Sequence, residues 1–257
     1  MSDPPAALAQ AVIDALALPP EAQVDQRVPK KLFLEHGAPT AADRKRIQSR
    51  LGEVTWVAAL KPGTIAVPAY RDAEREYLEV AVLRMRTQGG YDDTRLPELV
   101  HRAIPYPLLL LSEGEATLTL SLAHKRWSRG EGQRVVLDGS VEQAVLHLPP
   151  LAVERDFVSS LAPSGERPRD LRELYDGWMA RVQALAAARV TERYVVAATA
   201  ARVSERREAL ARYGEVIREL AALRLSAERE KQINKRVELN LELRRLEHER
   251  AELLERL

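Results

Sequence analysis

The fold class is decided by residues 107–123, PLLLLSEGEATLTLSLA. The first five residues are continuously apolar, which is typical of a strand buried on both faces of a sheet. Residues 112–115, SEGE, are typical of a hairpin turn. Residues 116–123 then alternate leucine with threonine and serine, so one face is apolar and the other polar. The stretch therefore predicts the centre of a β-sheet.

Further strands are predicted on both sides of this stretch. The patterns place them at residues 53–60, 64–67, 77–86, 134–138 and 143–148, with the last two forming a hairpin around Gly139-Ser140. The first three are close enough along the chain for a meander. In residues 77–86, Glu79 is expected to face solvent or to pair with Arg84 or Arg86.

Helices are predicted before, within and after the sheet region. Residues 5–17 are amphipathic, residues 28–34 begin a helix with Pro29 at its first position, and Thr40 with Asp43 forms a capping box for a helix to Leu51. Thr94 is expected to cap a helix to residue 104. After Pro149-Pro150 the pattern is helical throughout.

These elements together predict an α+β fold. We expect a mixed, mostly antiparallel sheet flanked by helices and followed by a helical C-terminal region with a coiled-coil-like arm. The corresponding domains are a sheet domain over residues 1–150 and a helical region over residues 151–257, which ends in a long, charged amphipathic helix.

The last helix carries a leucine stripe with heptad spacing and Arg250 in one core position. Ile233 and Val237 lie on a neighbouring stripe. One interpretation is a surface helix packed on its own domain, and the other is an assembly arm. Arg250 disfavours a symmetric parallel dimer, so we expect either an intramolecular hairpin with residues 190–213 or docking on a partner protein. The predicted partner-binding residues are Leu239, Leu243, Leu246, Leu253 and Leu257.

Composition excludes several classes of protein. The 257 residues contain no cysteine, which rules out a disulfide scaffold, a thiolate zinc site and a cysteine nucleophile. The net charge of +1 is too small to indicate a nucleic acid, a membrane surface or an acidic substrate as the partner. No run approaches the ~18 apolar residues that span a bilayer. Residues 1–18 lack a basic start and contain Asp3 and Asp14, so we expect a cytoplasmic protein rather than an exported one.

No catalytic motif is complete. The five histidines are scattered, and neither a phosphate-binding glycine loop nor a nucleophile elbow is present. The order of elements resembles the core of restriction-endonuclease-type nucleases, which hold Mg²⁺ with an acid on one strand and an acid-x-Lys on the next. Here Asp72 precedes the strand that contains Glu79, but Glu79-Val80-Ala81 lacks the lysine. We expect no catalytic residue, no metal and no cofactor.

Two predicted helices carry basic residues that could form one surface. Solvated helix faces are the simpler interpretation, and contact with nucleic-acid phosphates is the alternative. A third basic cluster, Lys125-Arg126, adjoins Trp127, which could stack on a base. The predicted nucleic-acid-binding residues are Lys30, Lys31, Arg44, Lys45, Arg46 and Arg50.

Four segments together resemble the family of the domain of unknown function numbered 4391: residues 27–33 (RVPKKLF), 54–68 (VTWVAALKPGTIAVP), 103–107 (AIPYP) and 234–240 (NKRVELN). The resemblance covers about residues 24–257. It implies that the gene of this protein lies beside genes for DNA methyltransferases and helicases like those of type III restriction systems. It therefore implies a non-enzymatic accessory subunit in bacterial anti-phage defence, which docks on a helicase or methyltransferase and can contact DNA. The alternative is a metal-dependent nuclease with an atypical or degenerate site.

Overall fold

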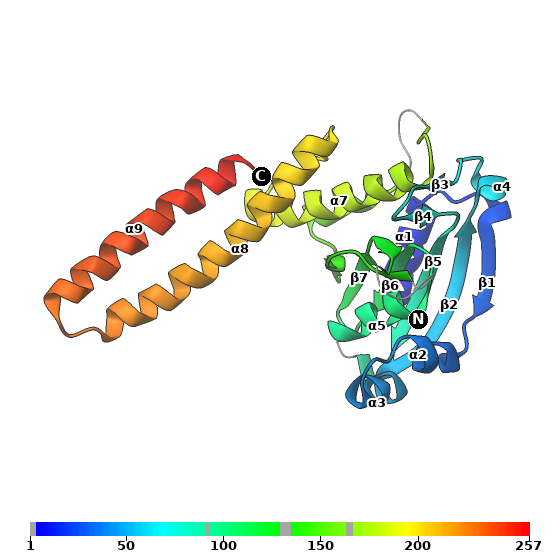
Figure 1. The fold of residues 1–257 in the computed structure, drawn as a ribbon, viewed down its shortest axis with the longest axis horizontal. Helices are drawn as coiled ribbons and strands as arrows, with labels where there is room; N and C mark the ends of the chain where they lie inside the picture. Colours follow the sequence, from blue (N-terminus) through cyan, green and yellow to red (C-terminus); the bar gives the residue numbers. More distant parts are fainter. Residues whose placement is uncertain (1–3, 91–92, 129–134, 163–166) are drawn as a thin grey trace. The chain divides into compact units, whose positions relative to one another are not determined.

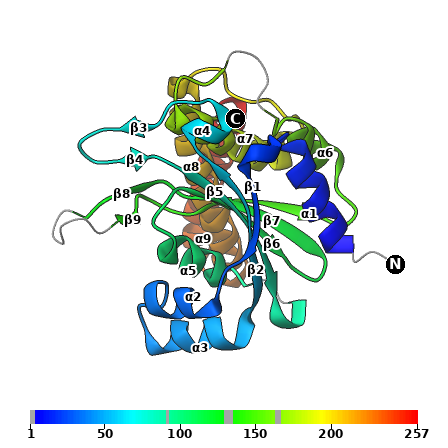
Figure 2. The ribbon, with the colours of Figure 1, turned by 90° about the vertical axis from the view of Figure 1, so that its right-hand side faces the viewer.

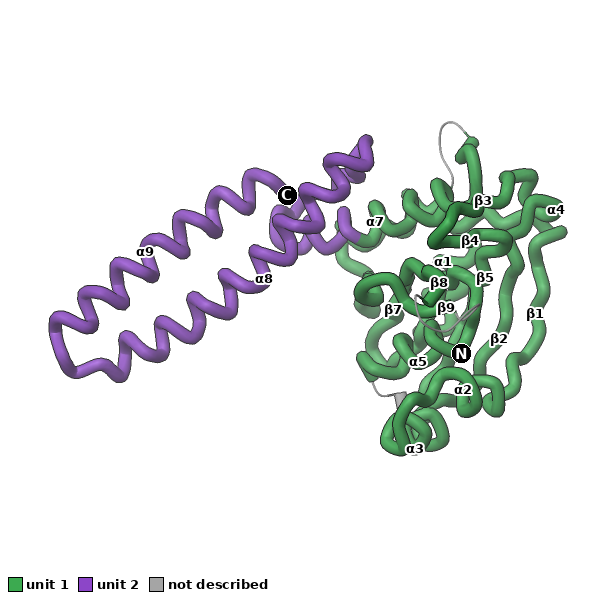
Figure 3. Tube along the Cα trace, in the orientation of Figure 1, with its two compact units in different colours: residues 1–182 green, residues 183–257 purple. Residues whose placement is uncertain are grey.

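The computed structural model describes residues 4–90, 93–128, 135–162 and 167–257. The chain forms two compact units, residues 1–182 and residues 183–257 (Figure 3). The first holds all of the described strands and the second consists of helices. The α+β class is confirmed. No helix among the described residues is both long enough and apolar enough to cross a bilayer.

The main sheet of unit 1 has six strands in the order β1-β2-β5-β6-β7-β10 (Figures 1 and 2). Every neighbouring pair is antiparallel except β5 and β6, which run parallel because the chain between them crosses over through helix α5 (Arg95–Ala103). This arrangement confirms the mixed, mostly antiparallel sheet. The strands are β1 (Gln23–Arg27), β2 (Leu51–Leu60), β5 (Val80–Thr87), β6 (Leu108–Glu113), β7 (Thr117–Leu122) and β10 (Glu142–His147).

The predicted central strand β6 is buried along its whole length. In its register, Leu110 lies opposite Leu83 of β5 and Ser121 of β7. Helices α2 (Lys30–His36), α3 (Ala41–Arg50) and α5 pack on one face of the sheet around Phe33, Ile47 and Leu99. Helix α1 (Pro4–Ala15) contacts β6 and β7. The remaining short elements of unit 1 are η1 (Pro20–Ala22), α4 (Pro62–Ile65), β3 (Tyr70–Arg71), β4 (Glu76–Tyr77), η2 (Gln88–Gly90), β8 (Lys125–Trp127), β9 (Val135–Leu137) and α6 (Ala152–Ser159).

The helix starts follow capping chemistry, with two corrections. Thr40 caps α3 as predicted, because its hydroxyl oxygen accepts from the Asp43 amide at 3.1 Å. Pro29 is the N-cap of α2 rather than its first helical residue. Thr94 makes no side-chain cap for α5, because the Asp93 carboxylate accepts from the two amides after Thr94 instead.

The predicted strand at residues 64–67 is wrong. Residues Pro62–Ile65 form a helical turn, in which the Thr64 hydroxyl donates to the Ala59 carbonyl at 2.9 Å and accepts from the Lys61 amide at 2.9 Å. Ala66 follows with a left-handed φ of 53°. Local hydrogen bonds of a threonine side chain thus outweigh the strand preference of its neighbours.

Two strand pairings also differ from the prediction. Residues 77–86 are split, since β4 pairs with β3 and β5 begins at Val80. β9 pairs with β8, and β10 pairs with β7, so the predicted hairpin around Gly139-Ser140 does not form. Alternation of apolar and polar residues shows which face of a strand is buried but not which strand it pairs with, and this accounts for the error. Arg134, the predicted first residue of β9, lies outside the described residues.

The helical part of the chain begins after Pro149-Pro150, but compact unit 1 continues to Val182. Helix α7 (Leu171–Thr191) joins the sheet through Tyr175, whose hydroxyl donates to the Leu108 carbonyl and accepts from the Ala123 amide, both at 2.8 Å. The Trp178 indole donates to the Leu161 carbonyl at 3.2 Å. These buried bonds place the first half of α7 with the sheet.

Unit 2 contains an antiparallel hairpin of α8 (Ala200–Arg229) and α9 (Ile233–Glu255) (Figure 1). Gly214 does not interrupt α8. Ion pairs join the two helices, with Arg212 Nε 2.6 Å from Glu249 and Arg224 Nη2 2.9 Å from Glu247. Of the two alternatives, the intramolecular hairpin forms, but the predicted partner segment, residues 190–213, is only partly right: residues 192–199 are not helical, and α9 packs on α8 as far as Arg224. The buried core of the hairpin is Ala209, Val216, Leu220, Leu246 and Leu253.

Candidate functional site

Two cavities in unit 1 are lined by opposite faces of the sheet. Successive side chains of a strand point to opposite faces. Trp56 and Leu83 therefore line one cavity, while Thr55 and Arg84 line the other. We call the first the apolar cavity and the second the polar cavity, according to the side chains that line them.

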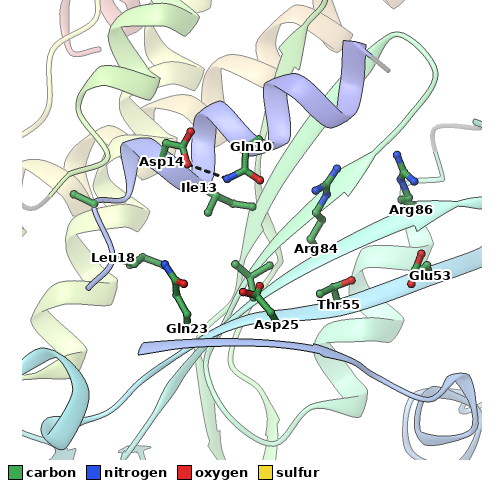
Figure 4. Close-up of a pocket in the computed structure, with 12 residues that line it drawn as sticks. Gln10, Ile13, Asp14, Leu18, Gln23, Asp25, Glu53, Thr55, Arg84 and Arg86 are labelled. Atoms are coloured by element: carbon green, nitrogen blue, oxygen red, sulfur yellow. Dashed lines mark hydrogen bonds between the residues drawn. The ribbon is translucent and has the colours of Figure 1, made fainter. Parts of the chain in front are cut away.

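The polar cavity has a volume of about 690 Å³ and lies between α1 and strands β1, β2 and β5. Figure 4 shows Arg84 and Arg86 next to each other on β5, at this cavity. Both guanidinium groups bond to the carboxylate of Glu113 on β6, and Arg86 Nε lies 2.9 Å from Oε2. Glu113 is buried, so one carboxylate offsets two cations inside the sheet.

The acids of the polar cavity come from three separate elements. Asp14 accepts from Gln10 at 2.9 Å on α1, and Glu53 on β2 lies 3.8 Å from Arg27. Asp25 occupies a bulge of β1, where its φ is 46°. Among the residues that the structure describes, no three His, Cys, Asp or Glu side chains are grouped to hold a metal ion.

The apolar cavity is larger, at about 880 Å³. Strands β2 and β5, helix α2, the end of α5 and the β8–β9 hairpin supply its walls. Three of the four segments that carry the family resemblance meet here, since Val28, Trp56 and Ile104 all line it. Two buried titratable residues, His101 and Lys125, also line this cavity.

Lys125 is 3% exposed. Its ammonium donates to the carbonyl of His101 at 2.7 Å and to the carbonyl of Ile104. The His101 carbonyl belongs to the last turn of α5 and Ile104 is its C-cap, a position where carbonyls lack intrahelical partners and a cation is favoured. Burial nevertheless lowers the pKa of Lys125 to about 7, from its usual 10.5.

His101 is completely buried on α5. Its Nε2 lies 3.0 Å from the Ser121 hydroxyl, and its Nδ1 has no hydrogen-bond partner among the described residues. Burial, and next the nearby Lys125 ammonium, lower the pKa of His101 to about 3. The imidazole is therefore neutral at pH 7, with one ring nitrogen unused.

The two acids of the incomplete nuclease pattern are bound to different partners. The Tyr70 hydroxyl donates to Asp72 at 2.6 Å, and this bond with two backbone amides lowers the pKa of Asp72 to about 2. Glu79 is buried and lies 3.1 Å from the Lys61 ammonium. The expectation that Glu79 faces solvent or pairs with Arg84 or Arg86 is wrong, because Glu113 occupies both arginines.

The predicted basic residues lie on two helices that pack together, as the contact of Lys30 Nζ with the Gln48 carbonyl at 3.4 Å shows. Arg46 and Arg50 both pair with Asp93, at 2.8 and 3.7 Å.

Lys31 pairs with Glu35 at 3.6 Å. Arg44 and Lys45 are exposed, and neither forms an ion pair with any residue in the described ranges. Ion pairs thus neutralise part of the predicted positive surface, and Arg44 and Lys45 are its exposed residues without an ion pair among the described residues.

The predicted leucine stripe of α9 packs largely inside the hairpin. Leu246 and Leu253 are in its core, and Leu243 and Leu257 pack against that core. Leu239 is half-buried. A neighbouring stripe of α9 remains outside: Ile233, Val237 and Leu241 are 69%, 52% and 60% exposed. We call these three residues the exposed stripe. Their spacing of four residues places them on one helix face.

The sequence analysis does not identify two residues that neutralise arginine pairs, Asp93 and Glu113. Asp93 pairs with Arg46 and Arg50 and caps α5. The adjacent Thr94 can cap a helix equally well, so the sequence does not show which of the two residues is the cap. The pattern of residues 112–115 indicates a turn, whereas Glu113 is the last residue of strand β6. The arginine pair on β5 could have indicated Glu113, because two cations on one face of a buried strand require an anion.

Comparison with known proteins gives one match. The sequence model of the domain of unknown function DUF4391 matches residues 16–249. Neither the curated proteins nor the solved structures include a match to this chain. The family match covers most of the sheet unit and most of the helical hairpin. The chain therefore belongs to the DUF4391 family.

Proposed function

We propose that the protein is a non-enzymatic accessory subunit of a bacterial anti-phage defence system. It docks on the DNA helicase or the DNA methyltransferase of that system and brings its basic helices to DNA. The family resemblance supplies the class of partner, and the exposed stripe on α9 is the observation that carries the docking function.

The exposed stripe is suited to a protein partner. Full burial of one such aliphatic side chain stabilises by roughly 1.5–3 kcal/mol, so covering the exposed part of all three contributes on the order of 3–5 kcal/mol. Lys235, Arg236 and Glu238 lie beside the stripe and are exposed. An apolar centre with a charged rim is the usual composition of a protein interface.

The leucines of α9 have a supporting part in this proposal. They hold α9 against α8, and the Arg212–Glu249 and Arg224–Glu247 ion pairs join the same helices. The exposed stripe is consequently presented on a helix that is already folded. Docking on such a surface requires little further ordering, which favours affinity.

The basic surface contributes contacts with phosphates. Arg44 and Lys45 are exposed on α3, and Lys30 lies on the adjoining helix. Phosphate contacts carry no sequence information and weaken steeply with salt. The net charge of +1 predicts weak DNA binding by the isolated chain and useful binding only after a partner has positioned it.

The nuclease alternative has less support. Asp72 accepts hydrogen bonds from Tyr70 and from two backbone amides, and Glu79 forms an ion pair with Lys61. We expect no cleavage when the purified chain is incubated with plasmid and Mg²⁺ or Mn²⁺. Cleavage that disappears in Glu79→Ala would favour the nuclease function over the accessory one.

Docking is tested by co-purification of the tagged chain with the helicase and the methyltransferase of its source organism. We expect the wild type to retain one of them, and the triple variant Ile233→Ser, Val237→Ser, Leu241→Ser to lose it. The matched control is Leu78→Ser, which changes a leucine that is 48% exposed in unit 1. Circular dichroism checks that the hairpin is still helical. Equal retention by the triple variant and the wild type would refute docking through the exposed stripe.

The DNA contact is tested in the assembled complex. Reversal of Arg44 and Lys45 to glutamate should weaken DNA binding about tenfold or more and flatten its salt dependence. Reversal of two exposed arginines of α8, Arg207 and Arg218, changes the charge equally and should have little effect. The same affinity for both double variants would contradict a specific role for α3.

A further inference from the structure

The apolar cavity has the size and the lining of a small-molecule site. Its volume of about 880 Å³ falls in the range of roughly 300–1,000 Å³ that is usual for ligand pockets. Leu32, Trp56, Leu83 and Val136 contribute apolar surface from four different elements. Such a cavity combines mostly apolar walls with a few polar groups that fix a ligand's orientation.

The polar groups of the cavity include a buried cation without an anionic partner. Among the described residues, the Lys125 ammonium contacts two carbonyl oxygens and no carboxylate. The other cations that line the cavity are neutralised, since Arg27 pairs with Glu53 at 3.8 Å and Arg102 with Glu98 at 2.8 Å. A buried amine is stabilised in its charged form by an anionic partner, so an anion in the cavity would favour the protonated form of Lys125 and pair with it.

His101 is a second polar residue in the lining of the cavity, next to Lys125. Its carbonyl is one of the two acceptors of Lys125, and its Nδ1 is buried without a partner among the described residues. In the tautomer in which Nε2 accepts from Ser121, Nδ1–H is a donor. An ammonium and an imidazole N–H are both hydrogen-bond donors suited to the oxygens of an acidic group.

We propose that the apolar cavity binds a small amphipathic monoanion, with its acidic group at Lys125 and His101 and its apolar or aromatic body against Trp56, Leu83 and Val136. This inference is independent of the docking function proposed above. Lys125 is too deeply buried for the regular phosphates of a nucleic acid strand, and a cavity of this size fits one compact body.

A pair of fluorescent probes tests the proposal. 1-Anilinonaphthalene-8-sulfonate carries one negative charge, and N-phenyl-1-naphthylamine has the same rings without it. We expect the wild type to bind both, and the Lys125→Met variant to lose about tenfold or more of its preference for the sulfonate over the neutral probe, as for one charge-assisted hydrogen bond. Lys30→Met is the matched control, because Lys30 lies on α2 but does not line the cavity.

The location of the probes is tested separately. Val136→Trp places a bulky ring in the cavity and should weaken both probes. The same bulk at Val145, which lines a different cavity, should leave both probes bound. Binding of both probes that is insensitive to Val136→Trp would place them elsewhere and overturn the assignment.

A wild-type measurement covers the case in which Lys125→Met does not fold. Octanoate and octanol differ in their acidic group, and we expect octanoate to displace N-phenyl-1-naphthylamine from the wild type at a clearly lower concentration than octanol does. Equal displacement by the two, or no binding of either probe, would refute a monoanion site. The cavity would then fit the apolar side chains of a partner protein better than a small molecule.

Discussion

Replacing Glu113 with glutamine should destabilise unit 1 more than any change to an exposed ion pair. The substitution keeps the size of the side chain but removes its charge. Arg84 and Arg86 lie two residues apart on β5, and Glu113 is opposite Arg86 in the parallel register with β6. Without the carboxylate, the two guanidinium groups face each other with only a neutral amide between them.

The magnitude follows from burial. Removing one partner of a fully buried pair costs roughly 3–5 kcal/mol. The Glu113 side chain is 4% exposed, but those of Arg84 and Arg86 are 23% and 47% exposed, so water screens part of the repulsion. We therefore expect the free energy of unfolding to fall by about 2–3 kcal/mol for Glu113→Gln.

Urea denaturation followed by tryptophan fluorescence measures this loss. The three tryptophans, Trp56, Trp127 and Trp178, all lie in unit 1, so the signal reports the unfolding of the sheet unit. The control is Glu53→Gln, since Glu53 forms an exposed pair with Arg27 and should cost below about 1 kcal/mol.

A double-mutant cycle separates charge from packing. Adding Arg84→Met to Glu113→Gln removes one of the two opposing cations, so it should recover part of the lost free energy. A loss of less than about 1 kcal/mol in Glu113→Gln, or a loss no greater than in Glu53→Gln, would refute the reasoning that this carboxylate offsets two cations.

Three further predictions concern the hairpin, a helix cap and the buried lysine. Leu246→Ala should cost about 2–4 kcal/mol of local stability, seen as faster amide exchange in α8 and α9 at an unchanged tryptophan midpoint. Thr40→Ala should lower the free energy of unfolding by about 1 kcal/mol, measured in urea, while Ser49→Ala, an exposed helical serine, should change it little. Because the folded pKa of Lys125 is about 7 and its usual value is 10.5, the unfolded chain binds more protons between these values, and stability should rise with pH in that window. The free energy of unfolding of the wild type relative to Lys125→Met should increase by about 2 kcal/mol from pH 7 to about pH 9, and a difference that does not change with pH would contradict the lowered pKa of the buried amine.

The regular part of the fold follows from local patterns. The apolar run at residues 107–111 belongs to the buried strand β6, and the alternation of residues 116–123 belongs to β7. Thr40 and Asp43 mark the start of α3 in the sequence as they do in the structure. In each case one short segment contains both the signal and its physical cause.

The pairing of strands depended on information that no short segment contains. β9 has the composition of a strand, yet its partner is β8 rather than β10. Thr64 lies in a sequence that favours strand, but its hydroxyl bonds to Ala59 and so closes a helical turn. Hydrogen bonds between distant residues decided the first case, and hydrogen bonds around a single side chain decided the second.

The candidate site was the least predictable part, because burial gives its residues their chemistry. The sequence places Lys125 with Arg126 in a basic cluster, for which a solvated surface or contact with phosphates is the natural interpretation. Lys125 lies instead beneath the end of α5, where backbone carbonyls accept hydrogen bonds from its ammonium and burial lowers its pKa.

The leucine stripe of α9 was more predictable than Lys125, because its periodicity indicates an apolar seam and left two alternatives for the partner, of which the structure shows packing on α8. Once α8 covers Leu246 and Leu253, the most exposed apolar side chains of α9 are those of the neighbouring stripe, at Ile233, Val237 and Leu241. A helix with two apolar stripes can pack on a neighbouring helix of its own chain with one stripe and bind another protein with the other. The hairpin contact and the proposed docking surface are therefore separate faces of the same helix, and they can be tested by separate substitutions.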